Sequence, residues 1–88
     1  MSYDIQFSKS ASKQIKKLSS EVQERIQTKI DNLAIEPRPD GIKKLKGREN
    51  AYRIRVGDYR IIYDIFDEVL LITVVEVGHR SNIYQNKS

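Results

Sequence analysis

Basic residues are concentrated in one short part of the chain. Residues 43–60 hold seven lysines and arginines and only two acidic residues, a net charge of +5, although the whole chain has a net charge of +4. A local cluster of this sign favours a partner that carries phosphate groups. The alternative is a solvated strand edge whose charges oppose aggregation. The basic residues are Lys43, Lys44, Lys46, Arg48, Arg53, Arg55 and Arg60.

The arginines of this region alternate with apolar residues. In residues 51–56, Arg53 and Arg55 must face away from the core if the apolar side chains face it. A two-residue turn at Gly57-Asp58 brings Arg60 close to them, on a surface that we expect to be open. Three guanidinium groups repel one another by several kcal/mol in a dry site, and a bound anion removes that repulsion. We interpret them as an anion site; the alternative is screening by solvent or acidic side chains.

Two residues near the C-terminal end have side chains suited to chemistry. His79 is the only histidine, and imidazole is the side chain that titrates most readily near neutrality. It follows the last predicted strand, where functional groups are common, although a lone histidine is more often incidental. Tyr84 could stack on a nucleobase beside a basic surface, or it could serve only in packing.

Composition narrows the classes of function. The chain has 88 residues, enough for one domain, and its 39% hydrophobic content argues against disorder. It contains no cysteine and one histidine, so we expect no metal site and no cofactor. It lacks both an apolar run of about 20 residues and a signal-peptide pattern, so we expect a cytoplasmic protein without membrane contact.

The periodicity of the sequence predicts an α+β fold. Residues 2–7 alternate as a strand, and Ser8 is a suitable N-cap for a helix that ends near residue 18. Ser20 and Gln23 have the spacing of a capping box for a second helix, which must stop at the prolines. Three strands follow, at residues 52–56, 59–66 and 69–77. We predict one domain over residues 1–88, with a small antiparallel-rich four-stranded sheet and an N-terminal helical hairpin packed on one face, in the order β-α-α-β-β-β.

Three stretches of the chain have a recognisable pattern: Lys44-Leu45-Lys46-Gly47, Ala51 to Tyr63, and Val77-Gly78-His79-Arg80 through Tyr84. With the element order, they resemble the RelE/ParE family of bacterial toxins from type II toxin-antitoxin systems, most closely the RelE branch. The resemblance implies a RelE-like fold and inhibition by a cognate RelB-like antitoxin. It also implies a metal-independent endoribonuclease, an mRNA interferase that inhibits translation by cutting mRNA in the ribosomal A site.

The resemblance also assigns roles to individual residues. It implies that Arg60 and Arg80 contact the scissile phosphate and that Tyr84 stacks on a base and orients the attacking 2′-hydroxyl. Arg53 and Arg55 stand where the family has two lysines, and arginine cannot lose its proton to act as a base. The base is therefore unassigned, and His79 is the candidate for proton transfer. The expected outlying phosphate contacts are Lys43, Lys44, Lys46 and Arg48.

Two other functions remain open at this stage. The ParE branch of the family inhibits DNA gyrase and needs no catalytic residues. A chain whose own activity has decayed could instead be a regulatory module whose arginines bind an acidic antitoxin. Operator DNA is a further candidate partner, bound through the toxin-antitoxin complex.

Overall fold

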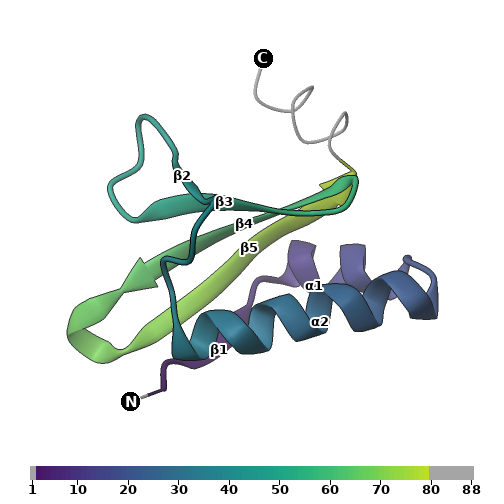
Figure 1. Cartoon of the computed structure of the whole chain (residues 1–88), viewed down its shortest axis with the longest axis horizontal. Helices are drawn as coiled ribbons and strands as arrows, with labels where there is room; N and C mark the ends of the chain where they lie inside the picture. The colour runs from purple at the N-terminus through teal and green to yellow at the C-terminus, as the bar shows by residue number, and fades with distance from the viewer. Residues whose placement is uncertain (1, 80–88) are drawn as a thin grey trace.

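The computed structural model describes residues 2–79, and its elements follow the predicted order (Figure 1). The elements are β1 (Asp4–Phe7), α1 (Lys9–Lys16), α2 (Ser20–Ile35), β2 (Lys43–Lys44), β3 (Ala51–Val56), β4 (Tyr59–Phe66), the 3-10 turn η1 (Asp67–Val69) and β5 (Leu71–His79). The predicted α+β class is therefore confirmed.

The strands form one sheet in the order β1-β5-β4-β3-β2. β1 runs parallel to β5, and the other neighbouring pairs are antiparallel. The sequence predicts four strands, whereas the described residues form five. The additional strand, β2, has only two residues, which is too short for alternation to reveal it.

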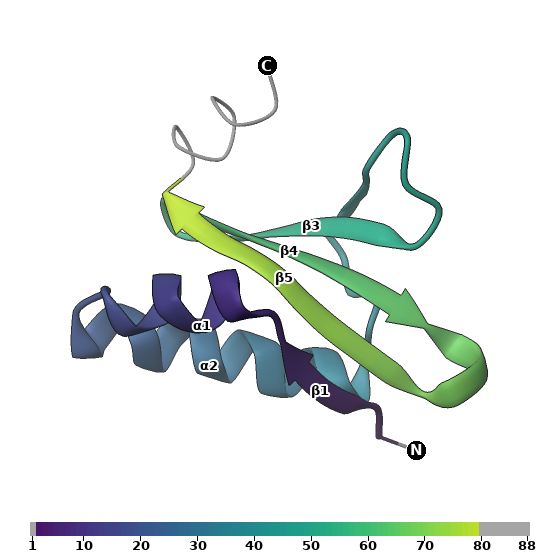
Figure 2. The same ribbon diagram turned by 180° about the vertical axis from the view of Figure 1, so that it is seen from behind.

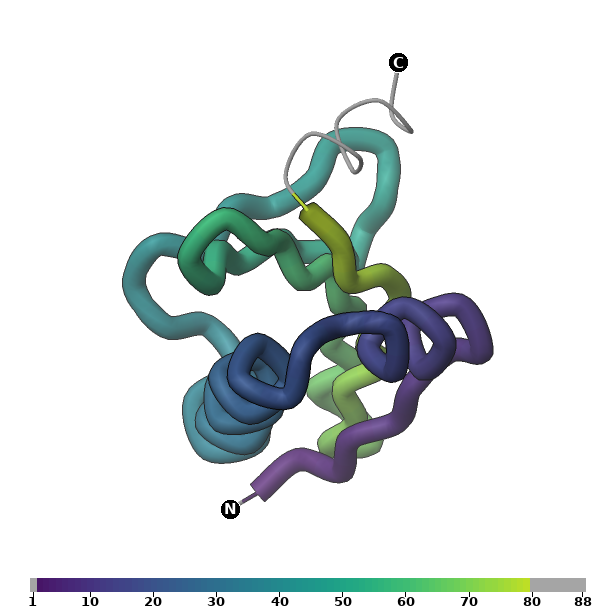
Figure 3. The backbone as a smooth tube through the Cα atoms, turned by 90° about the vertical axis from the view of Figure 1, so that its right-hand side faces the viewer, coloured from purple at the N-terminus to yellow at the C-terminus, as the bar shows by residue number. Residues whose placement is uncertain are grey.

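Both helices cover the same face of the sheet, as Figures 1 and 3 show. The other face has no helix against it within the described residues, and the loop between β2 and β3 extends away from the helices (Figures 1 and 2). No helix in residues 2–79 has the length and apolar character needed to cross a membrane. The buried core between helices and sheet consists of Ala11, Ile26, Ile30, Leu33, Ile54, Ile61, Tyr63, Ile65, Ile72, Val74 and Val77.

Serine residues cap both helices. Ser8 has an extended backbone, and its hydroxyl oxygen accepts a hydrogen bond from the N–H of Ala11 at 3.0 Å, as predicted. The cap of α2 is Ser19, not the predicted Ser20, because Ser19 has the extended backbone and Ser20 is already helical. The side-chain amide of Gln23 donates to the carbonyl oxygens of Lys16 and Leu18 and does not form the predicted capping box.

β5 contains one extra residue, Val75. Glu76 pairs with Ile62, whereas Val74 pairs with the residue that follows Ile62, so Val75 has no partner on β4. This β-bulge reverses the alternation along the strand. Val74 and Val77 both belong to the core, and Glu76 faces the opposite side of the sheet.

The segment around α1 supports the bulge. The hydroxyl of Ser8 donates to the carbonyl oxygen of Val75 at 2.7 Å, and the N–H of Val77 donates to Oε1 of Gln14 at 2.7 Å. β1 pairs with β5 only as far as Val74, so these backbone groups receive side-chain partners in place of strand partners. The bulge is therefore part of the helix-sheet contact.

The last strand differs from its predicted limits of residues 69–77. It begins later because the preceding residues form η1, after which Leu70 takes a left-handed backbone with φ 52°. It also continues beyond residue 77, because Gly78 and His79 pair with Arg60 and Tyr59 on β4. Both changes follow from pairing with β4.

The assignment of the two sheet faces can be tested with adjacent residues of β3. Ile54 is 3% exposed in the core, so Ile54→Asp buries an unpaired charge. That cost is several kcal/mol, comparable with the whole stability of a small domain, about 5–15 kcal/mol. We expect no cooperative thermal unfolding transition for Ile54→Asp by circular dichroism. Arg55→Asp, on the exposed side, should unfold cooperatively; a normal transition for Ile54→Asp would mean that the faces are reversed.

Candidate functional site

The β3-β4 hairpin places two arginines directly opposite each other. Arg55 pairs with Arg60, and Arg53 pairs with Ile62, so all four side chains project from the same face of the sheet. Gly57 begins the connecting turn with φ 60°, a conformation that favours glycine in hairpin turns of this length. We call this side of the sheet the arginine face; besides these four residues it includes Lys43, Asp64 and Glu76.

Arg60 is buried, which corrects the expectation that it lies on an open surface. It is 4% exposed, whereas Arg55 is exposed and Arg53 is intermediate. The reason is its place on β4, which has strands on both sides, whereas β2 pairs with β3 only beside Tyr52 and Arg53. The alternation of residues along a strand predicts the face of the sheet on which a side chain lies, but not how deeply that side chain is buried. A change at Arg60 therefore affects the packing of the sheet.

Glu76 belongs to the arginine face although the pattern of the sequence does not place it there. Unbroken alternation from Val74 would turn Glu76 into the core; the bulge at Val75 turns it toward the arginines instead. Glu76 is half-buried and lies across from Ile62. One signal in the sequence pointed to it, because a carboxylate cannot be buried in an apolar core without a large cost.

The structure does not bring His79 together with the arginines. His79 pairs with Tyr59, and the two rings meet edge to face with their centroids 5.6 Å apart and an interplanar angle of 79°. Tyr59 packs against the core, so this pair projects on the helix side of the sheet. His79 and Arg60 thus lie on opposite faces by register.

Lys43 and Lys44 lie on different faces of the sheet. They begin the segment 43–50, which we call the basic loop. Lys43 pairs with Arg53 and so extends the arginine face, whereas Lys44 pairs with Tyr52. The ammonium group of Lys44 lies 5.1 Å from the centre of the Tyr52 ring and donates to the carbonyl oxygen of Glu49. Lys43 is therefore the better placed of the two for a ligand on the arginine face.

Arg48 connects the basic loop to the sheet through an ion pair with Asp64. Nη2 of Arg48 lies 2.8 Å from Oδ2 of Asp64, and the carboxylate side chain is only 14% exposed. Asp64 faces the same side of β4 as Arg60, so Arg48 is drawn toward that side. Lys46 is exposed within the loop.

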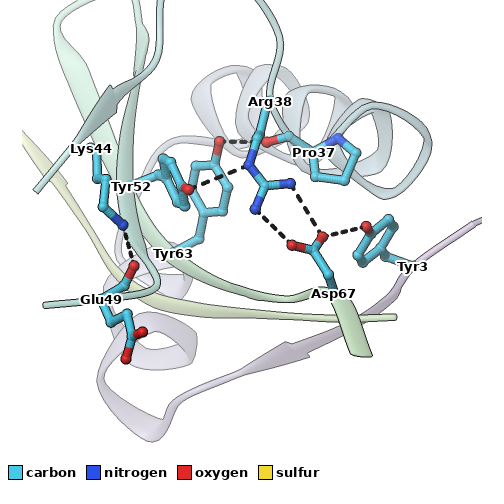
Figure 4. A network of polar contacts seen from close by, with 8 residues as sticks. All are labelled: Tyr3, Pro37, Arg38, Lys44, Glu49, Tyr52, Tyr63 and Asp67. Atoms are coloured by element: carbon cyan, nitrogen blue, oxygen red, sulfur yellow. Dashed lines mark hydrogen bonds and ion pairs between the residues drawn. The ribbon is translucent and has the colours of Figure 1, made fainter. Parts of the chain in front are cut away.

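A second polar cluster joins Tyr52 on β3 to Asp67 in η1 and to Tyr3, which directly precedes β1 (Figure 4). Arg38 donates two hydrogen bonds to the carboxylate of Asp67, at 2.8 and 3.2 Å, and a third to the hydroxyl of Tyr52. The hydroxyl of Tyr3 donates to Oδ1 of Asp67 at 2.6 Å. The hydrogen bonds from Arg38, followed by that from Tyr3, lower the pKa of Asp67 to about 2.

Tyr63 anchors the same loop from inside the core. Its hydroxyl donates to the carbonyl oxygen of Pro37 at 2.9 Å, and burial raises the pKa of the phenol. Its ring centre lies 6.1 Å from that of Tyr52 (Figure 4). The segment that leads into the basic loop is therefore held by a buried tyrosine as well as by Arg38.

The arrangement on the arginine face is suited to binding an anion. Arg55, Arg60 and Arg53, with Lys43 beside them, can hold one phosphodiester by charge and hydrogen bonds. In residues 2–79, no three histidine, cysteine or acidic side chains gather as metal ligands would. Arg80 and Tyr84, which the resemblance adds to the site, lie outside the described residues.

Known proteins resemble the chain over most of its length. A family model described as "ParE toxin of type II toxin-antitoxin system, parDE" matches residues 5–84. The mRNA interferase toxin RelE of Escherichia coli K12 is 33% identical over 88 residues, covering 96% of this chain and 92% of the relative. The structure of an archaeal RelE-RelB complex from Pyrococcus horikoshii OT3 has a TM-score of 0.81 at 29% identity, covering 91% of this chain and 97% of that one. The intact E. coli RelBE complex has a TM-score of 0.78 at 32% identity, covering 88% and 95%.

The cluster around Asp67 predicts a pH-dependent contribution to stability. The folded-state pKa of Asp67, about 2, is below its ordinary 3.8, so the stabilisation is present above about pH 4 and is lost as the pH falls toward 2. We expect Asp67→Asn to lower the melting temperature by a few degrees at neutral pH and to converge with the wild type near pH 2. Asp40→Asn, in the same loop as Arg38, is the control. A pH-independent gap between Asp67→Asn and wild type would contradict this assignment.

Proposed function

Because the chain belongs to the ParE toxin family of type II toxin-antitoxin systems, we propose that it is a toxin that cuts mRNA on the ribosome and is neutralised by a RelB-like antitoxin. The reaction takes place in the cytoplasm, where messages are translated. The relative named mRNA interferase toxin RelE supports the RelE activity over the gyrase-directed activity of the ParE branch. Two neighbouring folds come from complexes of RelE with RelB, which supports an antitoxin of that type.

One structural observation carries the proposal: Arg55 and the buried Arg60 form a cross-strand pair on a sheet face that the helices do not cover. A buried guanidinium has few alternative positions, so Arg60 is held ready for a phosphate group. Arg55 and Arg53 lie beside it at the surface, where an RNA strand can reach them. A DNA-gyrase inhibitor that acts by protein contact alone would not require this arrangement.

The chemistry follows from the charge that develops in RNA cleavage. Attack of a 2′-oxygen on the adjacent phosphorus places negative charge on the phosphoryl oxygens and on the departing 5′-oxygen. Guanidinium groups that are fixed before the reaction stabilise this charge without reorganising. In this scheme Arg60 and Arg55 hold the phosphoryl oxygens and Arg53 binds the neighbouring backbone. The resemblance to the RelE branch adds Arg80 as a further contact to the phosphate. It also adds Tyr84, whose ring stacks on a base of the RNA.

Replacing each arginine of the cross-strand pair tests this function. Purified chain added to a translating extract should produce new mRNA ends within translated codons, and RelB-like antitoxin should prevent them. Arg60→Ala and Arg55→Ala should each slow cleavage by about 10²–10³-fold, the usual loss when one charge-stabilising donor is removed. Thermal unfolding should separate the two, because Arg60→Ala loses buried packing worth about 1–3 kcal/mol while Arg55→Ala does not.

Other outcomes of the same experiment would select a different function. Intact messages with both wild type and Arg60→Ala would exclude mRNA cleavage. Protein-linked double-strand DNA breaks in their place would indicate gyrase as the target. A salt-sensitive antitoxin complex with no growth arrest would indicate a regulatory module without its own activity.

The register of β2 predicts that neighbouring lysines contribute unequally. Lys43 lies on the arginine face, whereas Lys44 lies against Tyr52 and Glu49. We therefore expect Lys43→Gln to weaken binding to programmed ribosomes, measured by sedimentation, and to reduce the salt dependence of binding by about one phosphate contact. Lys44→Gln, with the same change of charge, is the matched control. Equal effects of the two substitutions would show that only the total charge of the loop matters.

A further inference from the structure

We propose that Glu76 is the proton acceptor of the reaction, taking the proton from the attacking 2′-hydroxyl. This inference rests on the proposed function, and it assigns the base that the arginines cannot supply. An arginine stays protonated and can only stabilise charge, whereas a carboxylate accepts both hydrogen bonds and protons.

The register of the sheet places Glu76 beside the phosphate-binding arginines. Arg60 pairs with Gly78, and Glu76 is two residues before Gly78 on β5, so Arg60 and Glu76 are diagonal neighbours on one face. Diagonal neighbours have Cα atoms about 7–8 Å apart, within the combined reach of a long side chain and a bound nucleotide. Gly78 contributes no side chain between them. Arg53 lies on the other side of Ile62 from Glu76, so a phosphodiester over Ile62 would contact both residues.

The other acidic strand residues of this face are less suitable. Asp64 lies four residues from Arg60 along β4, about 13 Å at the rise of a β-strand. Asp4 pairs with Leu71, seven residues from Gly78 and about 23 Å away along the strand. Among the described strands, Glu76 is therefore the carboxylate nearest to Arg60 on the arginine face.

The bulge at Val75 explains why glutamate and not histidine occupies this place. With unbroken alternation from Val74, His79 would project on the arginine face and Glu76 into the core; the extra residue exchanges the two. Bulges commonly re-aim side chains beside functional sites. Here Ser8 and Gln14 supply hydrogen bonds that hold the bulge open, so the exchange is built into the packing of α1 on β5.

The reaction step is balanced with the residues named. The 2′-hydroxyl gives its proton to the Glu76 carboxylate, and the 2′-oxygen forms a bond to phosphorus. The bond between phosphorus and the 5′-oxygen then breaks, and the 5′-oxygen takes a proton from water. The products are a 2′,3′-cyclic phosphate and a 5′-hydroxyl end, and Glu76 returns its proton to solvent.

A different role for Glu76 makes opposite predictions. If the carboxylate only offsets the charge of the arginines, its removal should strengthen RNA binding and should not slow cleavage. If it only orients Arg60, its removal should slow cleavage, but an added base should not restore the rate. A general base contributes about 10²–10⁴-fold to rate, which is large enough to separate these roles.

The test uses the whole chain, ribosomes and a short message with one codon in an empty A site. Single-turnover cleavage and ribosome binding are measured for wild type, Glu76→Gln, Glu76→Asp and Glu76→Ala, with thermal unfolding to verify folding. Glu68→Gln, in η1 at the far end of the β4-β5 hairpin, is the control for loss of one negative charge. Imidazole is added to Glu76→Ala at increasing concentration.

We expect Glu76→Gln to cleave at least 100-fold more slowly at saturating concentration without weaker binding, Glu76→Asp to be partly active, and imidazole to raise the rate of Glu76→Ala. Cleavage by Glu76→Gln within threefold of wild type, with Glu76→Asp equally active, would overturn the assignment. Slow cleavage without imidazole rescue would also overturn it, in favour of a positioning role. If wild type itself leaves the message intact, the proposed function fails and the role of Glu76 fails with it.

Discussion

The pairing of β4 with β5 is the interaction on which the rest of the arrangement depends. β4 carries Arg60 and the buried row of the core, and β5 lies between it and β1. One extra residue, Val75, keeps apolar side chains in the core on both sides of the bulge. Without it the second half of β5 would present Glu76 to the core, at a large desolvation cost. The bulge therefore serves stability and at the same time determines which side chains meet the arginines.

The position of Arg60 in the middle of the sheet has two consequences. Its guanidinium is held among neighbouring strands, which favours a preorganised phosphate contact. The same burial makes the residue part of the fold, whereas the exposed Arg55 can be replaced with little effect on packing. Replacing a charged side chain at the exposed edge of a sheet changes stability little, but such a side chain is also weakly held in position. Replacing a buried charged side chain in the middle of a sheet destabilises the fold, and the surrounding strands hold that side chain in place.

The basic loop is held from a part of the chain that is remote in sequence. Arg38 connects Tyr52, at the base of this loop, with Asp67 in the turn before β5, and Tyr3, directly before β1, donates to the same carboxylate. The ammonium group of Lys44 also lies near the Tyr52 ring, 5.1 Å from its centre. These contacts are exposed and individually weak, but they share members and so restrain one another. These contacts therefore help to hold the loop in the position in which Lys43 lies beside Arg53.

Local patterns in the sequence were enough to predict the class of fold, the serine cap of α1, the β3-β4 turn and the side of the sheet on which Arg53, Arg55 and Arg60 lie. Each of these follows from periodicity or from residues close together in the chain, for which local sterics and hydrogen bonds suffice. The burial of Arg60, the short strand β2 and the presence of Glu76 instead of His79 on the arginine face depend on how the strands pack and pair. Burial depends on how many strands flank a position, and a bulge exists only in the pairing of two strands. Neither property is contained in the alternation of a single strand.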